Sequence, residues 1–360
     1  MDKVFLLLFV HKKKTLPYPC RSHKMTGTTP LLQANHVTKR YGPMTALSDL
    51  SLTINADRPA ITAVVGESGS GKTTLARIIL GLTPPSAGDV LYKGQNLATL
   101  SGTERRAFRR DVQAVFQDPY EVYNPFYRVD HVLTTPVKKF GLANSRAEAR
   151  AMIENALRAV GLRPEEILGR FPHQLSGGQR QRIMVARAVL MKPKLIVADE
   201  PVSMVDASLR ATILGSLRKL TDEMGISIIY ITHDLATAYQ VSDNILVMYR
   251  ACIAEAGEIE RVVKHPQHPY TKLLISSIPK VSTTRDWLED DGEQAVATHP
   301  SARGCRFLDR CPVTMPQCAS HLPPLYRTEP HRAAACFQYE TNPELAAEAL
   351  DDVLVASPVQ

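Results

Sequence analysis

The sequence lacks any apolar run that approaches the roughly 20 residues needed to cross a bilayer. If the chain acts at a membrane, separate subunits must therefore supply the spanning part. An apolar stretch over residues 4–10 is short, and a lysine cluster follows it, whereas a secretory signal places its positive charge first. We interpret residues 1–25 as a disordered extension, or as an upstream start whose natural equivalent is Met25.

The net positive charge is small outside this first segment. The net charge is +7, but residues 1–25 hold six basic residues and one acidic residue, so the other 335 residues carry only +2. Binding to nucleic acid through overall basicity therefore loses most of its support, and we expect no nucleic-acid partner. Internal repeats, low-complexity tracts and a long coiled coil are also lacking. The composition is that of an ordinary globular protein with room for one large core and a smaller unit.

The order of apolar segments predicts an α/β fold. Residues 31–37 and 47–54 alternate like the strands of an antiparallel layer. Residues 60–65 resemble a strand buried on both faces, and a helix over 72–82 follows a glycine-rich loop. Helices and strands then alternate, which predicts a mostly parallel sheet covered on both sides. The predicted segments are helices 178–190 and 209–224, strands 194–198 and 226–232, and closing strands 245–249 and 252–256.

The remaining segments suggest further units around this core. Residues 118–177 are mostly helical and predict a helical subdomain inserted into a nucleotide-binding domain that spans 31–280. An amphipathic segment covers 271–278, and 282–300 are polar and acidic like a linker. We expect a small extension with four cysteines over 281–340 and a tail over 341–360.

The segment Gly66-Glu67-Ser68-Gly69-Ser70-Gly71-Lys72-Thr73 has the spacing of a phosphate loop, and a strand precedes it and a helix follows it. Glycines let the backbone N–H groups surround a triphosphate, and the helix N-terminus adds positive partial charge. Lys72 is placed to reach the β- and γ-phosphates, and the Thr73 hydroxyl to bind Mg²⁺. The predicted nucleotide contacts here are Gly66, Ser68, Gly69, Gly71, Lys72, Thr73 and Thr74.

Two carboxylates emerge where the strand over 194–198 ends. Asp199 is expected to hold Mg²⁺, directly or through water, and Glu200 to polarise the attacking water as a general base. Alone, this pair would more simply be two solvated acids. The phosphate loop elsewhere in the sequence favours the catalytic interpretation.

Five further motifs occur along the chain: Tyr41, Gln117, the segments 175–179 and 203–206, and His233. In their order and spacing around the phosphate loop they resemble those of the nucleotide-binding subunits of the ABC transporter superfamily, whose fold is a P-loop NTPase. The resemblance extends from about Leu31 to Lys280. The resemblance implies that Tyr41 stacks on adenine, that Gln117 joins the Mg²⁺ site, and that His233 is a catalytic switch. It also implies that the segment 175–179, Leu-Ser-Gly-Gly-Gln, completes the ATP site of a second subunit together with Asp206 of the segment 203–206. The residues assigned to that second site are Ser176, Gly177, Gly178, Gln179 and Asp206.

The C-terminal third resembles one branch of this family, the oligopeptide and dipeptide importers. The matching motifs are His265-Pro266-Gln267-His268-Pro269-Tyr270 and the cysteine-containing segment that begins at Gly304. This resemblance implies an ATPase on the cytoplasmic face of the membrane, bound to permease subunits and a second ATPase subunit, in a heterodimer or a homodimer. An extracytoplasmic substrate-binding protein would act indirectly, and residues 120–128 are our hypothesis for the permease contact.

Three alternatives stay open at this point. Relatives in the same branch import nickel or oligosaccharides instead of peptides. A soluble ABC ATPase that acts on nucleic acid or ribosomes usually has two cassettes in one chain or a long coiled coil, and neither is found here. A non-hydrolysing regulatory subunit would be expected to lose Glu200 or His233, and both are present.

Four cysteines follow the spacing C-x5-C-x6-C-x17-C at Cys305, Cys311, Cys318 and Cys336. Thiolates in fours suit Zn²⁺ or an iron–sulfur cluster, but zinc sites usually contain a C-x2–4-C pair, which this sequence lacks. A phosphate-loop ATPase works in the cytosol, where disulfides are disfavoured. Some members of the branch carry a [4Fe–4S] cluster on this pattern, so the resemblance implies such a cluster, with zinc and free thiols as the alternatives.

Overall fold

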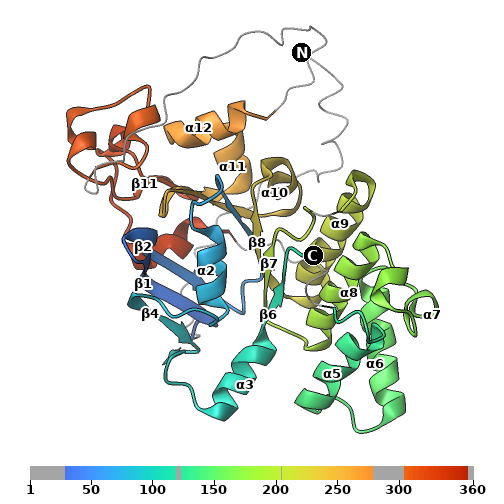
Figure 1. Cartoon of the computed structure of the whole chain (residues 1–360). Coiled ribbons are helices and arrows are strands. Elements are labelled where there is room, and N and C mark those ends of the chain that lie inside the picture. The colour runs from blue at the N-terminus through green and yellow to red at the C-terminus, as the bar shows by residue number, and fades with distance from the viewer. Residues whose placement is uncertain (1–28, 119–122, 204, 279–303, 356–360) are drawn as a thin grey trace, which may run out of the picture.

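The structure is a computed structural model, and it describes residues 29–118, 123–203, 205–278 and 304–355. The predicted N-terminal extension and the predicted linker over 282–300 lie outside these residues. Figure 1 shows strands at the centre of the molecule with helices around them. Across the described ranges, no helix is both long enough and apolar enough to cross a membrane.

An antiparallel sheet begins the domain, as the sequence predicts. Within the described residues it has the strand order β2-β1-β4-β5. Its strands are β1 (Leu32–Tyr41), β2 (Met44–Ile54), β4 (Ala87–Tyr92) and β5 (Gln95–Asn96). A tight turn joins the first two, so Tyr41 pairs with Met44 and Leu32 pairs with Ile54.

The larger sheet contains eight strands among the described residues, in the order β11-β12-β10-β9-β3-β8-β7-β6. Strands β6, β7, β8, β3 and β9 are mutually parallel, which confirms the predicted parallel core. Their bounds are β3 (Ile61–Val65), β6 (Val112–Val115), β7 (Leu195–Asp199), β8 (Ser227–Thr232) and β9 (Asn244–Tyr249). Strand β10 (Cys252–Glu258) continues the sheet antiparallel to β9.

Side chains alternate between the two faces of this sheet and create two apolar cores. In β3, Ile61, Ala63 and Val65 belong to one core, whereas Val64 belongs to the other. The first core includes α8 (Gly177–Leu190), α9 (Ala207–Met224) and α10 (Leu235–Val241), and the second includes α2 (Lys72–Ile79) and the antiparallel sheet. Helix α2 ends three residues before the predicted position, because Gly81 adopts a left-handed conformation (φ 65°) that terminates the helix.

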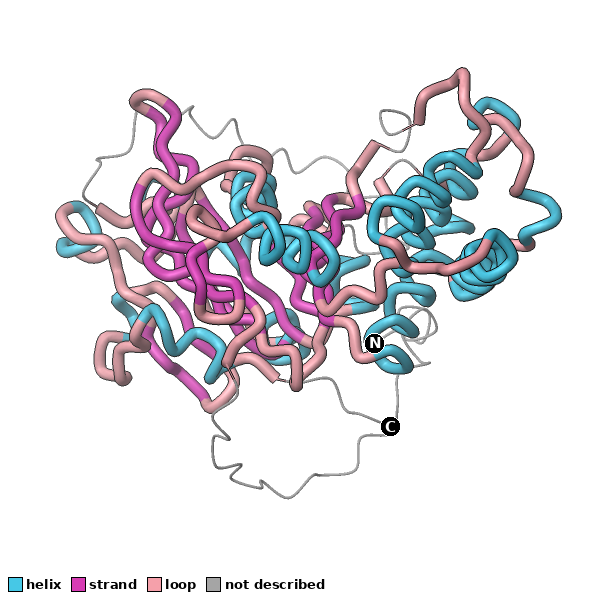
Figure 2. Tube along the Cα trace, turned by 90° about the horizontal axis from the view of Figure 1, so that it is seen from below, coloured by secondary structure: helices cyan, strands magenta, loops and turns pink. Residues whose placement is uncertain are grey.

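A helical unit lies to one side of the strands, as Figure 2 shows. It consists of α5 (Asp130–Phe140), α6 (Arg146–Ala159), α7 (Pro164–Ile167) and a short 3-10 helix, Pro172–Gln174. Its apolar side chains pack on α8. Helix α3 (Gly102–Asp111), which the sequence analysis does not identify, precedes β6 and has a capping box formed by Ser101 and Glu104.

The cysteine-containing extension is built onto the core sheet. After α11 (Ile259–Lys264) and α12 (Pro269–Ser276), the strands β11 (Tyr326–Glu329) and β12 (Arg332–Ala334) extend the larger sheet beyond β10. A buried ion pair secures this edge: Arg332 Nη2 lies 3.0 Å from Glu255 Oε1, and both side chains are almost fully buried. Short 3-10 helices cover Leu308–Arg310, Pro316–Ala319 and Phe337–Tyr339.

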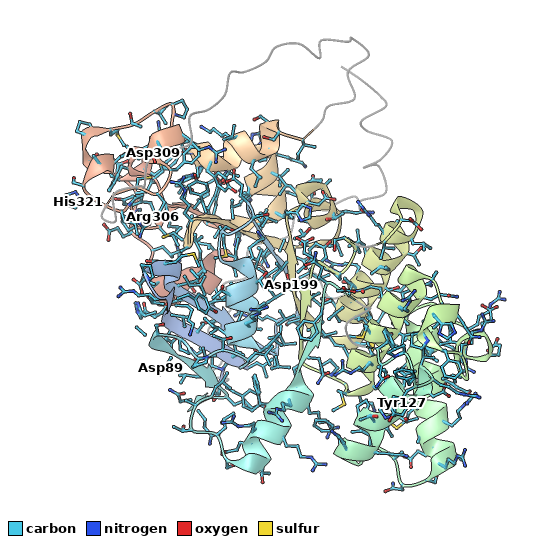
Figure 3. All side chains as sticks on the ribbon, viewed as in Figure 1. Asp89, Tyr127, Asp199, Arg306, Asp309 and His321 are labelled. Atoms are coloured by element: carbon cyan, nitrogen blue, oxygen red, sulfur yellow. The ribbon has the colours of Figure 1, made fainter. Side chains whose placement is uncertain are left out.

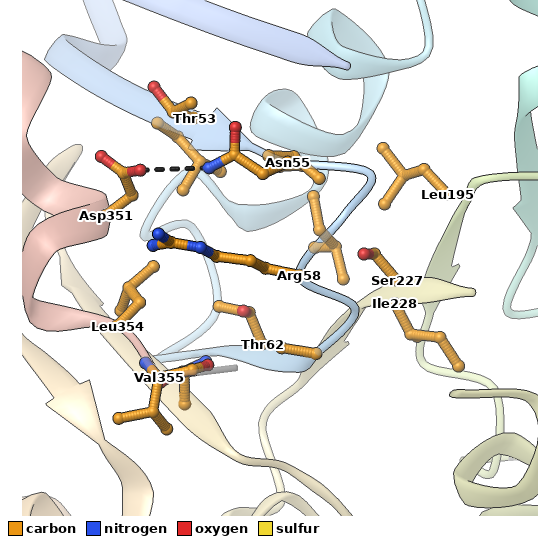
Figure 4. A pocket seen from close by; sticks show the side chains of 15 residues that line it. Thr53, Asn55, Arg58, Thr62, Leu195, Ser227, Ile228, Asp351, Leu354 and Val355 are labelled. Carbon is orange, nitrogen blue, oxygen red and sulfur yellow. Dashed lines mark hydrogen bonds between the residues drawn. The ribbon is translucent and has the colours of Figure 1, made fainter. Parts of the chain in front are cut away.

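Residues that the sequence analysis groups into a tail over 341–360 pack into the second core. Leu345, Leu350 and Val353 are buried there, the last two in a 3-10 helix, Ala347–Val353. The main chain of Val355 forms two hydrogen bonds with the Asn244 side chain at the start of β9. Figure 4 shows the small cavity of about 60 Å³ that this segment closes, with Asp351 bonded to Asn55.

Candidate functional site

The phosphate-loop segment connects β3 to α2, as its spacing predicts. The backbone is so closely packed that side chains at two of its glycines would collide with main-chain oxygens. A Cβ at Gly66 would lie 2.1 Å from the Met248 carbonyl oxygen, and one at Gly71 would lie 2.3 Å from that of Ala46. Both glycines also have positive φ angles, of 153° and 107°. Glycine is therefore required here for the loop to fold.

Lys72 is the first residue of α2 and points back into the loop. Its ammonium donates to the carbonyl oxygens of Gly66 at 2.7 Å and Glu67 at 2.8 Å. Burial lowers the pKa of Lys72, while the charges of Glu200, Asp199 and Glu67 oppose that shift. A phosphate oxygen beside this ammonium would favour its charged form, so the buried ammonium would attract a phosphate group.

Asp199 lies at the carboxyl end of β7, near the centre of the molecule in Figure 3. Burial and the neighbouring Glu200 carboxylate raise the pKa of Asp199, and a hydrogen bond from the Thr73 hydroxyl lowers it. A hydroxyl and a carboxylate in contact offer the hard oxygen ligands that Mg²⁺ prefers. These donors fit a magnesium site.

Glu200 has a left-handed backbone (φ 50°), which is uncommon for a residue with a side chain. Its N–H donates to the Ile231 carbonyl oxygen on β8 at 2.9 Å, which fixes this conformation. The carboxylate then reaches His233, whose Nδ1 lies 2.6 Å from Glu200 Oε1 and whose backbone N–H donates to the same oxygen. Backbone strain of this kind is common at functional sites.

One pocket of about 1090 Å³ brings most of the predicted residues together. The predicted residues that line it are Tyr41, Ser68, Gly69, Gly71, Lys72, Thr73, Thr74, Gln117, Asp199, Glu200 and His233. Tyr41 is 42% exposed at the rim, with Lys39 Nζ 5.2 Å from its ring centroid. Gly66 does not line the pocket, although its carbonyl oxygen holds Lys72.

Three arginines also line this pocket, and the sequence motifs assign no role to them. They are Arg40 before Tyr41, Arg250 in the turn between β9 and β10, and Arg306 in the cysteine-containing extension. Cations are suited to a polyphosphate ligand. Of the three, only Arg40 could have been assigned to the site from the sequence, because it precedes Tyr41. Tertiary packing brings Arg250 and Arg306 to the site.

The segment Leu175–Gln179 and Asp206 do not line the pocket. Ser176 caps α8, accepting a hydrogen bond from the Gln179 N–H at 3.2 Å, while its own N–H donates to Gln179 Oε1 at 2.9 Å. Gly178 packs closely against α9, and a Cβ there would lie 2.8 Å from Leu209 Cδ1, so that this leucine side chain would have to shift. Asp206 occupies the N-cap position of α9 without a side-chain hydrogen bond to the helix, and Met204 of the same motif lies outside the described residues.

The four predicted cysteine ligands gather in the extension as free thiols. Burial raises the pKa of Cys305 to about 11, and charges on the other three cysteines act in the same direction. Burial also raises the pKa values of Cys311 and Cys336. Among the described residues, however, no group of three or more His, Cys, Asp or Glu side chains is arranged to hold a metal ion.

Comparisons of the sequence with known proteins identify the families that this chain resembles. A family model described as "ABC transporter" matches residues 47–203, and one described as "Oligopeptide/dipeptide transporter, C-terminal region" matches residues 254–318. The chain is 41% identical over 280 residues to a putative oligopeptide transport ATP-binding protein, YkfD, of Bacillus subtilis, covering 77% of this chain and 84% of that protein. It is 39% identical over 304 residues to the di/tripeptide transport ATP-binding protein DppF of Pseudomonas aeruginosa, covering 84% and 92%.

Solved structures of ATP-binding cassettes are also similar to this chain. The dimeric post-hydrolysis state of the ATP-binding cassette MJ0796, bound to ADP and Pi, is similar with a TM-score of 0.56 and 29% identity over 63% of this chain and 98% of that one. The cbiO1 protein from Clostridium perfringens, part of the ABC transporter complex cbiONQ, is similar with a TM-score of 0.58 and 28% identity over 66% and 92%.

Proposed function

This chain belongs to the ABC transporter ATP-binding family, and from that premise we propose that it is the ATP-hydrolysing subunit of a peptide importer. The observation that carries the proposal is the pocket in which the phosphate loop, Asp199 and Glu200 meet. The match of residues 254–318 to the oligopeptide/dipeptide C-terminal region supports peptides as the cargo, as do the names of the relatives.

In the proposed mechanism, the loop amides and the Lys72 ammonium bind the β- and γ-phosphates of ATP. Thr73 and Asp199, with Gln117 at the same pocket wall, would hold Mg²⁺. The metal ion, when bound, neutralises charge on the phosphate oxygens. The aromatic ring of Tyr41 at the rim offers a stacking surface for the adenine base.

Glu200 is the proposed general base. Its carboxylate orients the attacking water and accepts its proton, and the left-handed backbone and the bond to His233 keep that carboxylate at the pocket wall. His233 is 64% exposed on its side chain, so it is free to meet the γ-phosphate side of a bound nucleotide. We propose that it couples the position of Glu200 to the presence of that phosphate.

A second ATPase subunit completes the site in this proposal. Ser176 is exposed and lies at the N-terminus of α8, outside the pocket of its own chain. A helix N-terminus capped by a serine and followed by glycines is suited to an anion supplied by another subunit. Gly177, Gly178, Gln179 and Asp206 are proposed to belong to that second half-site.

The permease contact is proposed to include the segment over 120–128, of which residues 123–128 are described. Phe126 is 86% exposed and Tyr127 is 52% exposed. Large apolar side chains on a surface are typical of a binding face. Because its relatives are named as ATP-binding proteins of peptide transport, we place the chain on the cytoplasmic face of the membrane, with an extracytoplasmic binding protein delivering the peptide to the permease.

A [4Fe–4S] cluster on the four cysteines remains a separate proposal. The donor set suits such a cluster, but the arrangement of these thiols described above does not, so no step of the mechanism depends on it. Iron and sulfide analysis of anaerobically purified protein tests it. Two findings would contradict the cluster: zinc without iron, or neither metal.

Reconstitution tests the proposed function. We expect the chain, assembled with its permease and second ATPase subunit in proteoliposomes, to drive accumulation of di- or oligopeptides only when ATP and Mg²⁺ are supplied on its side. Uptake of nickel or an oligosaccharide with no peptide uptake would contradict the cargo. Failure of the assembled transporter to hydrolyse ATP would contradict the proposal as a whole.

A further inference from the structure

The extension and the segment before it both form hydrogen bonds with Glu67 of the phosphate loop. Arg310 Nη1 lies 2.9 Å from one Glu67 carboxylate oxygen and 3.2 Å from the other. The Glu67 backbone N–H donates to the Tyr270 hydroxyl at 2.9 Å. Both the side chain and the main chain of this loop residue are therefore held by groups more than 200 positions away in the sequence.

A packed aromatic cluster supports both of these groups. Tyr249, Tyr270 and Phe307 are all nearly fully buried, and the centroids of the Tyr249 and Tyr270 rings are 4.4 Å apart. The Phe307 ring contacts both tyrosines. The Arg310 guanidinium lies over the rings of Phe307 at 5.8 Å and Tyr249 at 6.0 Å. Such stacking limits the conformations available to the arginine and presents it to Glu67.

Glu67 is in turn connected to Lys72. The Glu67 carbonyl oxygen accepts a hydrogen bond from the Lys72 ammonium at 2.8 Å. We propose that Arg310 and Tyr270 are positioning residues of the ATP site: by fixing Glu67 they set the phosphate loop and Lys72 in the geometry that binds the nucleotide. Neither residue lines the pocket, so both act through Glu67. This inference rests on the proposal that the loop holds ATP.

The position of Arg306 supports the connection between extension and nucleotide. It belongs to the same short segment as Arg310, between Cys305 and Cys311, and it lines the nucleotide pocket itself. Figure 3 labels Arg306 and Asp309 in this part of the extension. The segment thus contacts the site in two ways, through a pocket wall and through Glu67.

A simpler role for the Arg310–Glu67 pair is to hold the extension on the domain. The Arg310 side chain is 28% exposed and that of Glu67 is 44% exposed, and half-exposed ion pairs contribute little to stability. The two roles differ in one measurable respect. A pair that only attaches the extension leaves ATP affinity unchanged, whereas a positioning pair changes ATP affinity in the intact fold.

The test measures Mg²⁺-ATP binding to the full chain by calorimetry. We expect Arg310→Gln to raise the ATP dissociation constant about three- to tenfold, and Tyr270→Phe, which keeps the buried ring, to raise it about two- to fivefold. The matched control is Arg327→Gln, which removes a surface pair with Asp352 in the same extension and contacts no loop residue. It is expected to bind ATP like the wild type.

Coupling is tested by the double variant Glu67→Gln/Arg310→Gln. Because both changes remove the same contact, between Glu67 and Arg310, we expect the double variant to bind ATP no more weakly than Glu67→Gln alone. Lys72→Ala separates the positioning role from the proposed ATP site, because it should abolish ATP binding whatever Arg310 and Tyr270 do. Suppose that the wild type binds ATP and Lys72→Ala does not, which supports the ATP site. If Arg310→Gln and Tyr270→Phe then both bind ATP like the wild type, the positioning role is wrong. Equal weakening by Arg310→Gln and Arg327→Gln would overturn the positioning role as well. A wild type that binds no ATP contradicts the proposed function itself.

Discussion

Single residues at the site have charges that burial disfavours. The pKa of Lys72 is lowered and that of Asp199 is raised, in each case chiefly because the group is buried. Bound phosphate favours the ammonium and bound Mg²⁺ favours the carboxylate, so nucleotide and metal ion restore both charged forms. We propose that the cost of burying these charges is recovered when a metal–polyphosphate complex binds.

Removal of the Thr73 hydroxyl tests whether this single group is a ligand of the proposed Mg²⁺ site. We predict that Thr73→Val, which removes the hydrogen bond to Asp199 and one proposed ligand of Mg²⁺, abolishes most of the gain in ATP affinity that Mg²⁺ provides. The measurement compares ATP dissociation constants with and without Mg²⁺, and we expect the ratio to fall about tenfold. The control, Thr134→Val in α5, makes the same change outside the pocket. An unaltered Mg²⁺ effect in Thr73→Val would refute this ligand.

At the scale of elements, the buried pair of Arg332 and Glu255 joins β12 to β10. Arg332→Met leaves the carboxylate of Glu255 buried without its cation, so we predict that the free energy of unfolding falls by about 3–5 kcal/mol. Urea unfolding of the full chain measures this. Arg327→Met, at an exposed pair of the same extension, should change the free energy of unfolding by no more than about 0.5 kcal/mol. Equal effects of the two variants would contradict the role of the buried pair.

His36 links β1 to the C-terminal segment and makes that contact pH-dependent. Hydrogen bonds to Glu348 and Asp49 raise the pKa of His36 above its usual 6.5. A group whose pKa is higher in the folded state stabilises the fold below its unfolded pKa, and the benefit is lost as the pH rises through the folded pKa. We predict that His36→Gln is less stable than the wild type at pH values below about 6 and equally stable near pH 9, where the ring is neutral.

Thermal unfolding at the two pH values measures this difference. His321→Gln changes an exposed histidine whose ring contacts the Ser320 hydroxyl, and it serves as the control. If His36→Gln lost the same stability at both pH values, the contact with the two carboxylates would not be the cause.

Elements with a strong local pattern were predictable, and those that depend on distant contacts were not. Strands such as β8 are continuous β-prone runs, and α8 begins at a serine cap, so both follow from the sequence. Helix α3 buries only Phe108 and has no apolar stripe, which explains why it was missed. The segment over 345–353 contains only scattered apolar residues, and its burial depends on β1, β2 and β10 being in place.

The same distinction holds for the site. Lys72, Asp199 and Glu200 occur in motifs whose spacing indicates their chemistry. The contact of Arg310 with Glu67 joins residues 243 positions apart, and nothing local in either segment indicates the other. The extension was therefore predicted as a separate unit, whereas its strands join the core sheet and its Arg306 lines the nucleotide pocket.

At the scale of the whole molecule, we propose that each chain carries half of an ATP site on one surface and the complementary half on another. We predict that Ser176→Arg leaves ATP binding to the isolated chain intact and stops ATP hydrolysis by the assembled transporter, because the second anion site is blocked. Ser145→Arg removes an equivalent cap at the start of α6 and is the matched control, since its cost to the fold is similar, about 1 kcal/mol. Hydrolysis by Ser176→Arg at the rate of Ser145→Arg would argue against a shared site.

The most direct measurement is the rate of ATP hydrolysis by the assembled transporter when this chain carries Glu200→Gln. We predict that turnover at its site falls about a hundredfold or more, while ATP binds as tightly as in the wild type, because only the general base is lost. Glu223→Gln, on an exposed position of α9, should hydrolyse ATP like the wild type. Unchanged turnover in Glu200→Gln would contradict the assignment of this pocket as the catalytic site.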